Sequence, residues 1–252
     1  MRDRVYRTEA VIIRRSAFGE ADRLLTLITP VGKRRVVAKG ARKTTSRLAG
    51  HIELFTHTSL LLAVGRNLDI ITQSTIIQSF DTLRGDLRRI SMAYYVAELI
   101  DRLTEEDDEN RPAFDLLVAT LQALDTTNTP DLVLRFYELH LLGYLGYRPQ
   151  LYHCASCQET LTEAANRFSP VAGGVLCSRC VAVDHRAIVM SLSAFKLLRY
   201  LQAQPLNAVE RLNISADVRD EAEKLLRVYI RRILERDMKS IAFLEEIRDL
   251  QS

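Results

Sequence analysis

Short runs of β-branched and leucine residues alternate with turn-forming residues through the first eighty positions of the chain. The runs cover residues 10–14, 23–29, 34–39, 53–64 and 68–77. Pro30 and Gly32 lie between the second and third runs, and Gly65 and Asn67 lie between the last two, as expected for tight turns. Five short strands without an intervening helical period predict a small closed barrel. A five-stranded OB-fold fits the strand count and length, and an SH3-like barrel fits the count almost as well.

From residue 81 onward the apolar positions recur every three or four residues, which predicts helices. The first predicted helix is long and ends at the acidic run of residues 105–109, which we expect to be a solvated loop. Its apolar face comprises Leu83, Leu87, Ile90, Tyr94, Ala97 and residues 100–103. Further helices are predicted over residues 112–124, 130–144, 218–233 and 240–250. Ser191 or Ser193 is expected to cap one more helix, which reaches residue 204.

The four cysteines of the chain form two C-x-x-C pairs separated by nineteen residues. They are Cys154, Cys157, Cys177 and Cys180. This spacing predicts a zinc ribbon over residues 151–183, in which two short turns place four thiolates around one Zn²⁺ ion. Four thiolates leave no open position for water, so the zinc is expected to be structural. His153 and His185 flank the site and could each replace a cysteine, but the four thiolates already close it.

Two other interpretations of the cysteines, a redox pair and disulfides, have less support than a zinc site. A thioredoxin-like redox pair needs a C-x-x-C at the start of a helix in a βαβ unit, and neither pair has that setting. Two disulfides would imply export, but the N-terminal residues lack the apolar core of a signal peptide. The predicted fold class is therefore α+β: an OB-fold barrel over residues 1–80, followed by a helical domain over residues 81–252 with the inserted zinc ribbon.

The charge of the chain is unevenly distributed. Residues 1–80 carry 14 Lys and Arg against 6 Asp and Glu, a net +8, whereas the remaining residues carry 21 against 26, a net −5. With 47% apolar residues among 252, the chain can build two or three modules with real cores. No stretch approaches the roughly 20 apolar residues of a membrane span, so we expect a soluble, cytoplasmic protein.

A basic segment in the first eighty residues is the main candidate for binding a polyanion. It contains seven cations and lies within the stretch between Asp22 and Glu53, which has no acidic residue. The predicted nucleic-acid-binding residues are these seven and two on the first strand: Lys33, Arg34, Arg35, Lys39, Arg42, Lys43, Arg47, Arg14 and Arg15. Gly, Thr and Ser residues in the same loop add backbone and hydroxyl donors for phosphate oxygens. The alternative is an ordinary solvated surface.

Aromatic platforms for stacking bases are few. Residues 1–80 contain only Tyr6, Phe18, Phe55 and Phe80, and the chain has no tryptophan. Binding is therefore expected to rely on phosphate contacts, with little reading of bases and a steep dependence on salt.

Catalytic motifs are absent from the sequence. Gly32 and Lys33 lack the upstream glycine and the following Ser or Thr of a P-loop, and neither G-x-S-x-G nor H-E-x-x-H occurs. We therefore expect a protein that is not an enzyme and binds no nucleotide. An RNA-associated protein and a zinc-dependent hydrolase are the alternative classes, and a site with four sulfur ligands argues against the hydrolase.

Several segments resemble the bacterial DNA repair protein RecO family, in order and at matching spacing. They are residues 19–30 (GEADRLLTLITP), 32–33 (GK), 38–43 (AKGARK), 46–50 (SRLAG), 143–149 (GYLGYRP), 168–177 (FSPVAGGVLC) and the two C-x-x-C pairs. Within the basic segment, Lys39, Arg42 and Lys43 match the basic positions of the family best, followed by Lys33 and Arg47.

The resemblance implies a recombination mediator with an OB-fold head, a helical bundle and a zinc ribbon. Such proteins bind single- and double-stranded DNA and anneal complementary strands without ATP. With the partner RecR they help to load RecA onto DNA coated by single-strand-binding protein, whose acidic tail contacts the helical part. The implied location is the cytoplasm, in association with the nucleoid.

Overall fold

The computed structural model describes residues 4–163, 166–209 and 211–250. The chain forms two compact units. The first comprises the residues up to Thr126 together with those from Ser240 onward, and the second comprises Thr127–Lys239. The division of the chain into an OB-fold domain over residues 1–80 and a helical domain over residues 81–252 stays a prediction.

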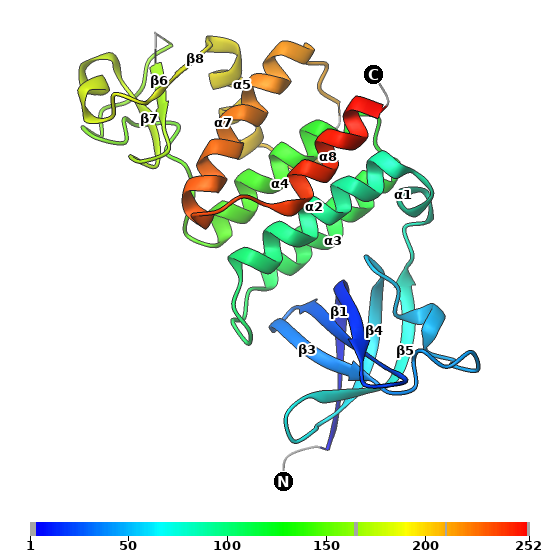
Figure 1. The fold of residues 1–252 in the computed structure, drawn as a ribbon. Helices are drawn as coiled ribbons and strands as arrows, with labels where there is room; N and C mark the ends of the chain where they lie inside the picture. The colour runs from blue at the N-terminus through cyan, green and yellow to red at the C-terminus, as the bar shows by residue number, and fades with distance from the viewer. Residues whose placement is uncertain (1–3, 164–165, 210, 251–252) are drawn as a thin grey trace. The chain divides into compact units, whose positions relative to one another are not determined.

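Five strands build a closed barrel in the first unit (Figure 1). They are β1 (Val5–Phe18), β2 (Asp22–Thr29), β3 (Gly32–Ala38), β4 (His57–Ala63) and β5 (Asp69–Gln78). Around the barrel their order is β1-β2-β3-β5-β4, with β3 and β5 parallel and the other pairs antiparallel. The OB-like barrel predicted from the sequence is thus confirmed.

Strand β1 is longer than the predicted run 10–14 because it pairs with two neighbours. Its first half pairs with β4 and its second half with β2, with a shift in register between Ile12 and Arg14. Only Ala10–Ile13 is buried on both faces, and that part alone carried a continuous apolar signal. The polar ends alternate and are mostly exposed, so they were missed.

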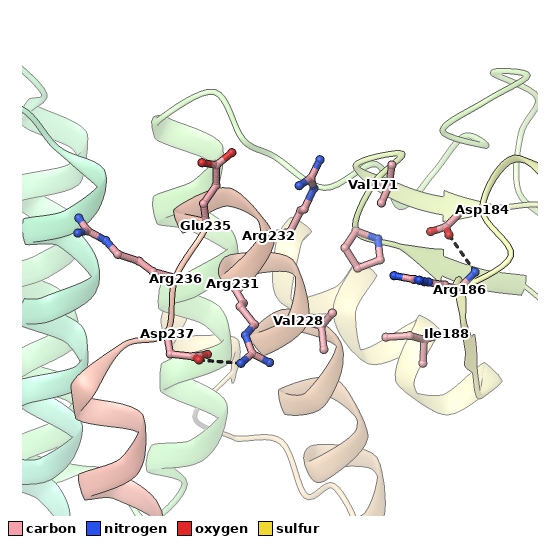
Figure 2. Close-up of a pocket in the computed structure, with 11 residues that line it drawn as sticks. Val171, Asp184, Arg186, Ile188, Val228, Arg231, Arg232, Glu235, Arg236 and Asp237 are labelled. Atoms are coloured by element: carbon pink, nitrogen blue, oxygen red, sulfur yellow. Dashed lines mark hydrogen bonds and ion pairs between the residues drawn. The ribbon is translucent and has the colours of Figure 1, made fainter.

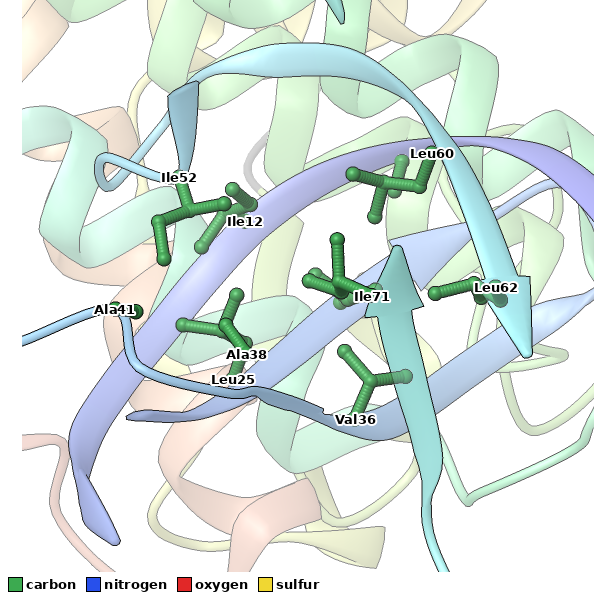
Figure 3. Packing of buried hydrophobic residues seen from close by; sticks show 11 residues of the cluster. Ile12, Leu25, Val36, Ala38, Ala41, Ile52, Leu60, Leu62 and Ile71 are labelled. Atoms are coloured by element: carbon green, nitrogen blue, oxygen red, sulfur yellow. The ribbon is translucent and has the colours of Figure 1, made fainter. Parts of the chain in front are cut away.

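The barrel interior is filled by inward-pointing aliphatic side chains from every strand (Figure 3). Ile12, Leu25, Leu60 and Leu62 are fully buried, and Ile71 is almost so. Inward and outward positions alternate along the strands, as the pleat requires. Truncation of one such leucine to alanine typically costs about 2–5 kcal/mol.

Four helices complete the first unit. They are α1 (Asp81–Gly85), α2 (Leu87–Leu103), α3 (Arg111–Thr126) and α8 (Lys239–Leu250). The single helix predicted from residue 81 is wrong, because Asp86 is extended and caps α2 by accepting the Arg89 N–H. Leu87 and Tyr94 were expected on the buried face but are 51% and 40% exposed, because α2 buries the face with Met92, Tyr95 and Val96 instead.

The second unit contains four helices and a small sheet. The helices are α4 (Pro130–Tyr144), α5 (Leu192–Ala203), α6 (Leu206–Val209) and α7 (Ala216–Leu234). Ser191, one of the two predicted caps, accepts the Ala194 N–H at the start of α5. The sheet has the order β7-β6-β8 and comprises β6 (Asn166–Ser169), β7 (Gly174–Leu176) and β8 (Ile188–Met190). Among the described helices, none is long and apolar enough to span a membrane.

Candidate nucleic-acid interface and metal centre

The four cysteine sulfurs gather at one point of the second unit. All lie within 4.8 Å of one another, and the Sγ atoms of Cys157 and Cys177 are 3.8 Å apart. A tetrahedral site with metal–sulfur bonds of about 2.3 Å places its sulfurs about 3.8 Å apart. The four cysteines are therefore positioned to bind one metal ion, as expected from their spacing. No histidine joins this cluster among the described residues.

Tight turns hold each cysteine pair in place. In the first turn the Cys154 N–H donates to the Glu159 carbonyl, and the Gln158 N–H donates to the Cys154 carbonyl. Gln158 adopts a left-handed conformation with a φ of 62°. The second pair begins a 3₁₀ turn in which the Cys180 N–H donates to the Cys177 carbonyl. Such turns aim both thiols of a pair at the same point.

Gly174 allows the segment before the first cysteine pair to approach β7. The Gln150 carbonyl accepts the Val175 N–H at 2.8 Å, and a Cβ added at Gly174 would lie 2.3 Å from that carbonyl oxygen. Only glycine fits this approach, which brings the segment with Cys154 beside the strand that leads to Cys177.

The thiols do not have equal acidities. Burial raises the pKa of Cys154, but backbone N–H donors at Cys157, Cys177 and Ser156 outweigh it and lower the pKa to about 6. The neighbouring Cys157 side chain raises the pKa of Cys180 to about 11. Closely spaced thiolates repel one another, and a bound cation removes that repulsion.

Four of the nine predicted nucleic-acid-binding cations lie in the connection between β3 and β4. We call residues 39–47 the basic loop. Its cations Lys39, Arg42, Lys43 and Arg47 are all exposed, and none of them pairs with a carboxylate among the described residues. Thr44 and Thr45 are exposed beside them.

The basic loop is fastened to the turn between β1 and β2. The Gly40 N–H donates to the Asp22 carboxylate at 2.7 Å, and the Arg42 N–H donates to the Ala21 carbonyl at 2.9 Å. The Arg42 guanidinium also reaches the carbonyls of Gly19 and Glu20. These bonds hold the loop in one place while leaving the two lysine ammonium groups in solvent.

The remaining five predicted cations are paired with carboxylates. The guanidinium nitrogen of Arg14 lies 3.0 Å from a carboxylate oxygen of Asp101. The corresponding distances are 3.2 Å for Arg34 and Asp107 and 3.9 Å for Arg35 and Glu106. Arg15 pairs with Glu53, and Lys33 lies 3.4 Å from the Asp101 carboxylate. The acidic run of residues 105–109 is therefore not simply the solvated loop that we expected.

Lys33 is the most enclosed of these cations. Its ammonium donates to the carbonyls of Asp101 and Thr104 at 2.7 and 2.5 Å, and its side chain is only 12% exposed. A polar cavity of about 370 Å³ lies beside it, lined in part by Arg14, Arg35 and Glu106.

The acidic run is joined to β3 through its backbone. The Asp107 N–H donates to the Lys33 carbonyl at 3.1 Å, and Lys33 and Glu106 form a parallel bridge. Gly32 has a φ of 104°, and a Cβ there would lie 2.6 Å from the Asp108 carbonyl oxygen. Glycine is thus required for the run to lie against β3.

A cleft of about 550 Å³ in the second unit is a further candidate site (Figure 2). Val171, Ile188 and Val228 give it aliphatic walls, and Arg186 extends across it toward α7. Two of its acids are engaged, because Asp237 pairs with Arg231 and the Asp184 carboxylate accepts the Arg186 N–H. Sequence reasoning missed the cleft because its residues are spread over about seventy positions.

Comparison with known proteins matches almost the whole chain to one family. The family description "Recombination protein O N terminal" matches residues 1–80, and "Recombination protein O C terminal" matches residues 84–242. The chain belongs to the RecO family of DNA repair proteins. The resemblance seen in the sequence is therefore confirmed.

Individual RecO proteins align along nearly their full length. The DNA repair protein RecO of Roseiflexus sp. (strain RS-1) is 64% identical over 250 residues, covering 99% of this chain and 88% of the relative. That of Dehalococcoides mccartyi is 39% identical over 243 residues, and that of Symbiobacterium thermophilum 34% identical over 248 residues. These two alignments cover 96–98% of every chain involved.

Proposed function

We propose that this RecO-family protein binds single- and double-stranded DNA through the basic loop. The observation that carries the proposal is the set of exposed cations at Lys39, Arg42, Lys43 and Arg47, which no carboxylate among the described residues neutralises. Lysine and arginine at such density attract the phosphate backbone and release its counterions. The position supports the proposal as well, because OB-folds bind oligonucleotides near strands 2 and 3 and the loop between strands 1 and 2.

Strand annealing follows from such a surface. Two complementary strands repel each other through their phosphates, and a cationic loop that holds one strand by its backbone lowers that repulsion. The bases remain free to pair with the incoming strand. The process needs no covalent step and no ATP, so we propose that the protein is a mediator and not an enzyme.

The proposal extends to the partners that family membership suggests. With RecR, the protein would help to load RecA onto DNA coated by single-strand-binding protein, and the acidic tail of that protein would contact the helical part of the chain. A cytoplasmic, nucleoid-associated location agrees with this role. Annealing of strands coated with single-strand-binding protein, measured with and without RecR, tests these partners.

We propose that the ion of the four-cysteine site is a single structural Zn²⁺. Thiolate sulfur is a soft ligand, and a set of four thiolates is typical of structural zinc sites. The four sulfurs close the coordination shell, so the ion would stabilise residues 151–183 and would not activate water. Metal analysis of the purified protein should give one zinc per chain.

The DNA-binding proposal is tested by reversing the charge of two lysines whose side chains do not help to hold the basic loop in place. In the variant Lys39→Glu/Lys43→Glu both side chains are exposed, and the bonds of Arg42 to the turn between β1 and β2 are kept. Affinity for labelled single-stranded DNA should fall at least tenfold in 50 mM salt, since each strand loses two phosphate contacts. Annealing of complementary strands should slow in parallel.

The matched control places the same charge change in the second unit. Lys224 and Arg211 are exposed and without an ion pair among the described residues, so Lys224→Glu/Arg211→Glu alters net charge equally. It should bind DNA within about twofold of the wild type. Equal losses in the two variants would show that net charge alone governs binding and would remove the basic loop as the site.

A further inference from the structure

Phe18 differs from the other aromatic residues of the barrel region. Phe55 and Phe80 are 1% and 5% exposed, and the Tyr6 hydroxyl donates to the Asp69 carboxylate at 2.5 Å. Burial and this hydrogen bond raise the pKa of Tyr6 to about 12. Phe18 is 43% exposed. It is therefore the exposed aromatic ring among the described residues up to Phe80.

The ring of Phe18 lies outside the core cluster of the barrel. The partly buried residues that pack against the barrel core are Tyr6, Leu48 and Leu54. Among the described residues, no aromatic ring or arginine stacks on Phe18. Phe18 keeps 43% of its surface in water, so part of this side chain is accessible to a ligand.

The position of Phe18 connects it to the basic loop. It is the last residue of β1, and its cross-strand partner is Asp22. Directly opposed residues of an antiparallel pair project from the same face of the sheet. The Asp22 carboxylate accepts the Gly40 N–H of the basic loop, so Phe18 projects from the face on which the loop is fastened.

The next residues along the chain strengthen this connection. The carbonyls of Gly19 and Glu20, directly after Phe18, accept hydrogen bonds from the Arg42 guanidinium. An exposed ring thus adjoins a fastened group of cations. Proteins that bind single-stranded DNA combine these two features, with phosphates on the cations and a base stacked on the ring.

We propose that Phe18 is a stacking platform for one unpaired base of the strand that the basic loop holds. This inference rests on the proposed DNA-binding function and adds a preference to it. An unpaired base exposes its face to the ring, whereas the bases of a duplex are already stacked on their neighbours. Phe18 therefore favours single strands over duplexes. One platform orders a single base and leaves the others free to anneal.

Removing the ring tests the proposal. Phe18→Ala and Phe18→Leu should each lower affinity for single-stranded DNA about five- to tenfold, the lower part of the range for loss of one stacked base. Affinity for duplex DNA and the salt dependence of binding should not change, because the cations remain. Phe18→Leu keeps an apolar side chain, so its loss of affinity separates stacking from general apolar contact. Val31→Ala, at another exposed apolar position, is the control and should bind as the wild type does.

A fluorescence measurement gives a second readout. The chain contains no tryptophan, so Phe18→Trp introduces a single reporter ring at the site. Its fluorescence should be quenched by single-stranded DNA and much less by duplex at equal saturation.

The outcomes separate this inference from the proposed function. Wild-type affinity of Phe18→Ala for single strands, or equal losses for single strands and duplexes, would overturn the stacking platform while DNA binding by the basic loop stands. Failure of the wild-type protein to bind any DNA would overturn both proposals.

Discussion

The surroundings of a lysine decide whether its charge is available to DNA. Lys33 and Lys39 both belong to the basic segment and are six positions apart, yet their environments are opposite. Lys33 is enclosed by acceptors from Asp101 and Thr104, whereas Lys39 is exposed and has no ion pair among the described residues. We therefore propose that Lys33 contributes to stability and that Lys39 contributes to DNA binding.

This difference predicts a clear contrast in stability. Lys33→Ala should lower the free energy of unfolding by about 1–3 kcal/mol, because two carbonyls and the Asp101 carboxylate lose their donor. Lys39→Ala, the matched control, should stay within about 0.5 kcal/mol of the wild type. Urea denaturation followed by circular dichroism measures both values. Equal stabilities for the two variants would contradict the assignment.

The metal site predicts a local effect on folding. Cys177→Ser should reduce bound zinc well below one ion per chain and open residues 151–183 to proteolysis, because an ion that binds only the folded ribbon stabilises it. The helices should remain, since each has its own buried apolar face.

His153→Ala is the control for this variant and should retain the zinc, because His153 lies outside the sulfur cluster. Metal analysis measures the zinc content of both variants, and limited proteolysis measures the protease sensitivity of residues 151–183. Unchanged zinc content in Cys177→Ser would refute a site made by four thiolates.

At the scale of elements, the acidic run of residues 105–109 neutralises part of the positive charge of β3. The run carries Glu106 and Asp107 to the guanidinium groups of Arg35 and Arg34, and its backbone bonds to Lys33 hold it there. Carboxylates in these positions occupy cations that phosphate groups would otherwise contact. This pairing agrees with the proposal that DNA binds mainly at the basic loop.

Neutralising these two acids should strengthen DNA binding. Glu106→Gln/Asp107→Asn frees Arg34 and Arg35, so we expect a three- to tenfold gain in affinity at low salt and a steeper salt dependence, by up to about 1.4 in slope. Titration of labelled single-stranded DNA at several salt concentrations measures both quantities.

Glu105→Gln/Glu109→Gln makes the same change in net charge at exposed carboxylates that contact no cation among the described residues. An equal gain in this control would show a general effect of net charge and would contradict specific masking of β3.

How far the sequence predicts these elements depends on the distance between partners along the chain. The hairpin of β2 and β3 depends on a local turn and was predicted closely, as were α3 and α4 with their N-terminal prolines. The bounds of β6 and β7, and the presence of β8, were not predicted because these strands have only three or four residues and no periodicity. Asp101, whose carbonyl accepts a hydrogen bond from Lys33, lies 68 positions away, and no local sequence pattern predicts this contact.

At the scale of the whole molecule, the positive charge of residues 1–80 is partly neutralised by acids from later in the chain. The net +8 of residues 1–80 suggests a broadly basic head. In the folded first unit, however, acids from α2 and the run that follows it pair with cations of β1 and β3. Among the cations of the described head that pair with no carboxylate, Lys39, Arg42, Lys43 and Arg47 lie together in the basic loop. Composition could therefore suggest the kind of ligand, whereas the fold was needed to show which cations are already paired with carboxylates.

The central claim is that DNA binds to the basic loop through its phosphates. The most direct test is the salt dependence of single-stranded DNA binding by the wild type and by Lys39→Glu/Lys43→Glu. Contacts from four cations predict a wild-type slope of log K against log salt of about −3, and the loss of two contacts should make it shallower by about 1.4 or more. A slope near zero, or the same slope in both proteins, would contradict the claim and leave the basic loop as solvated surface.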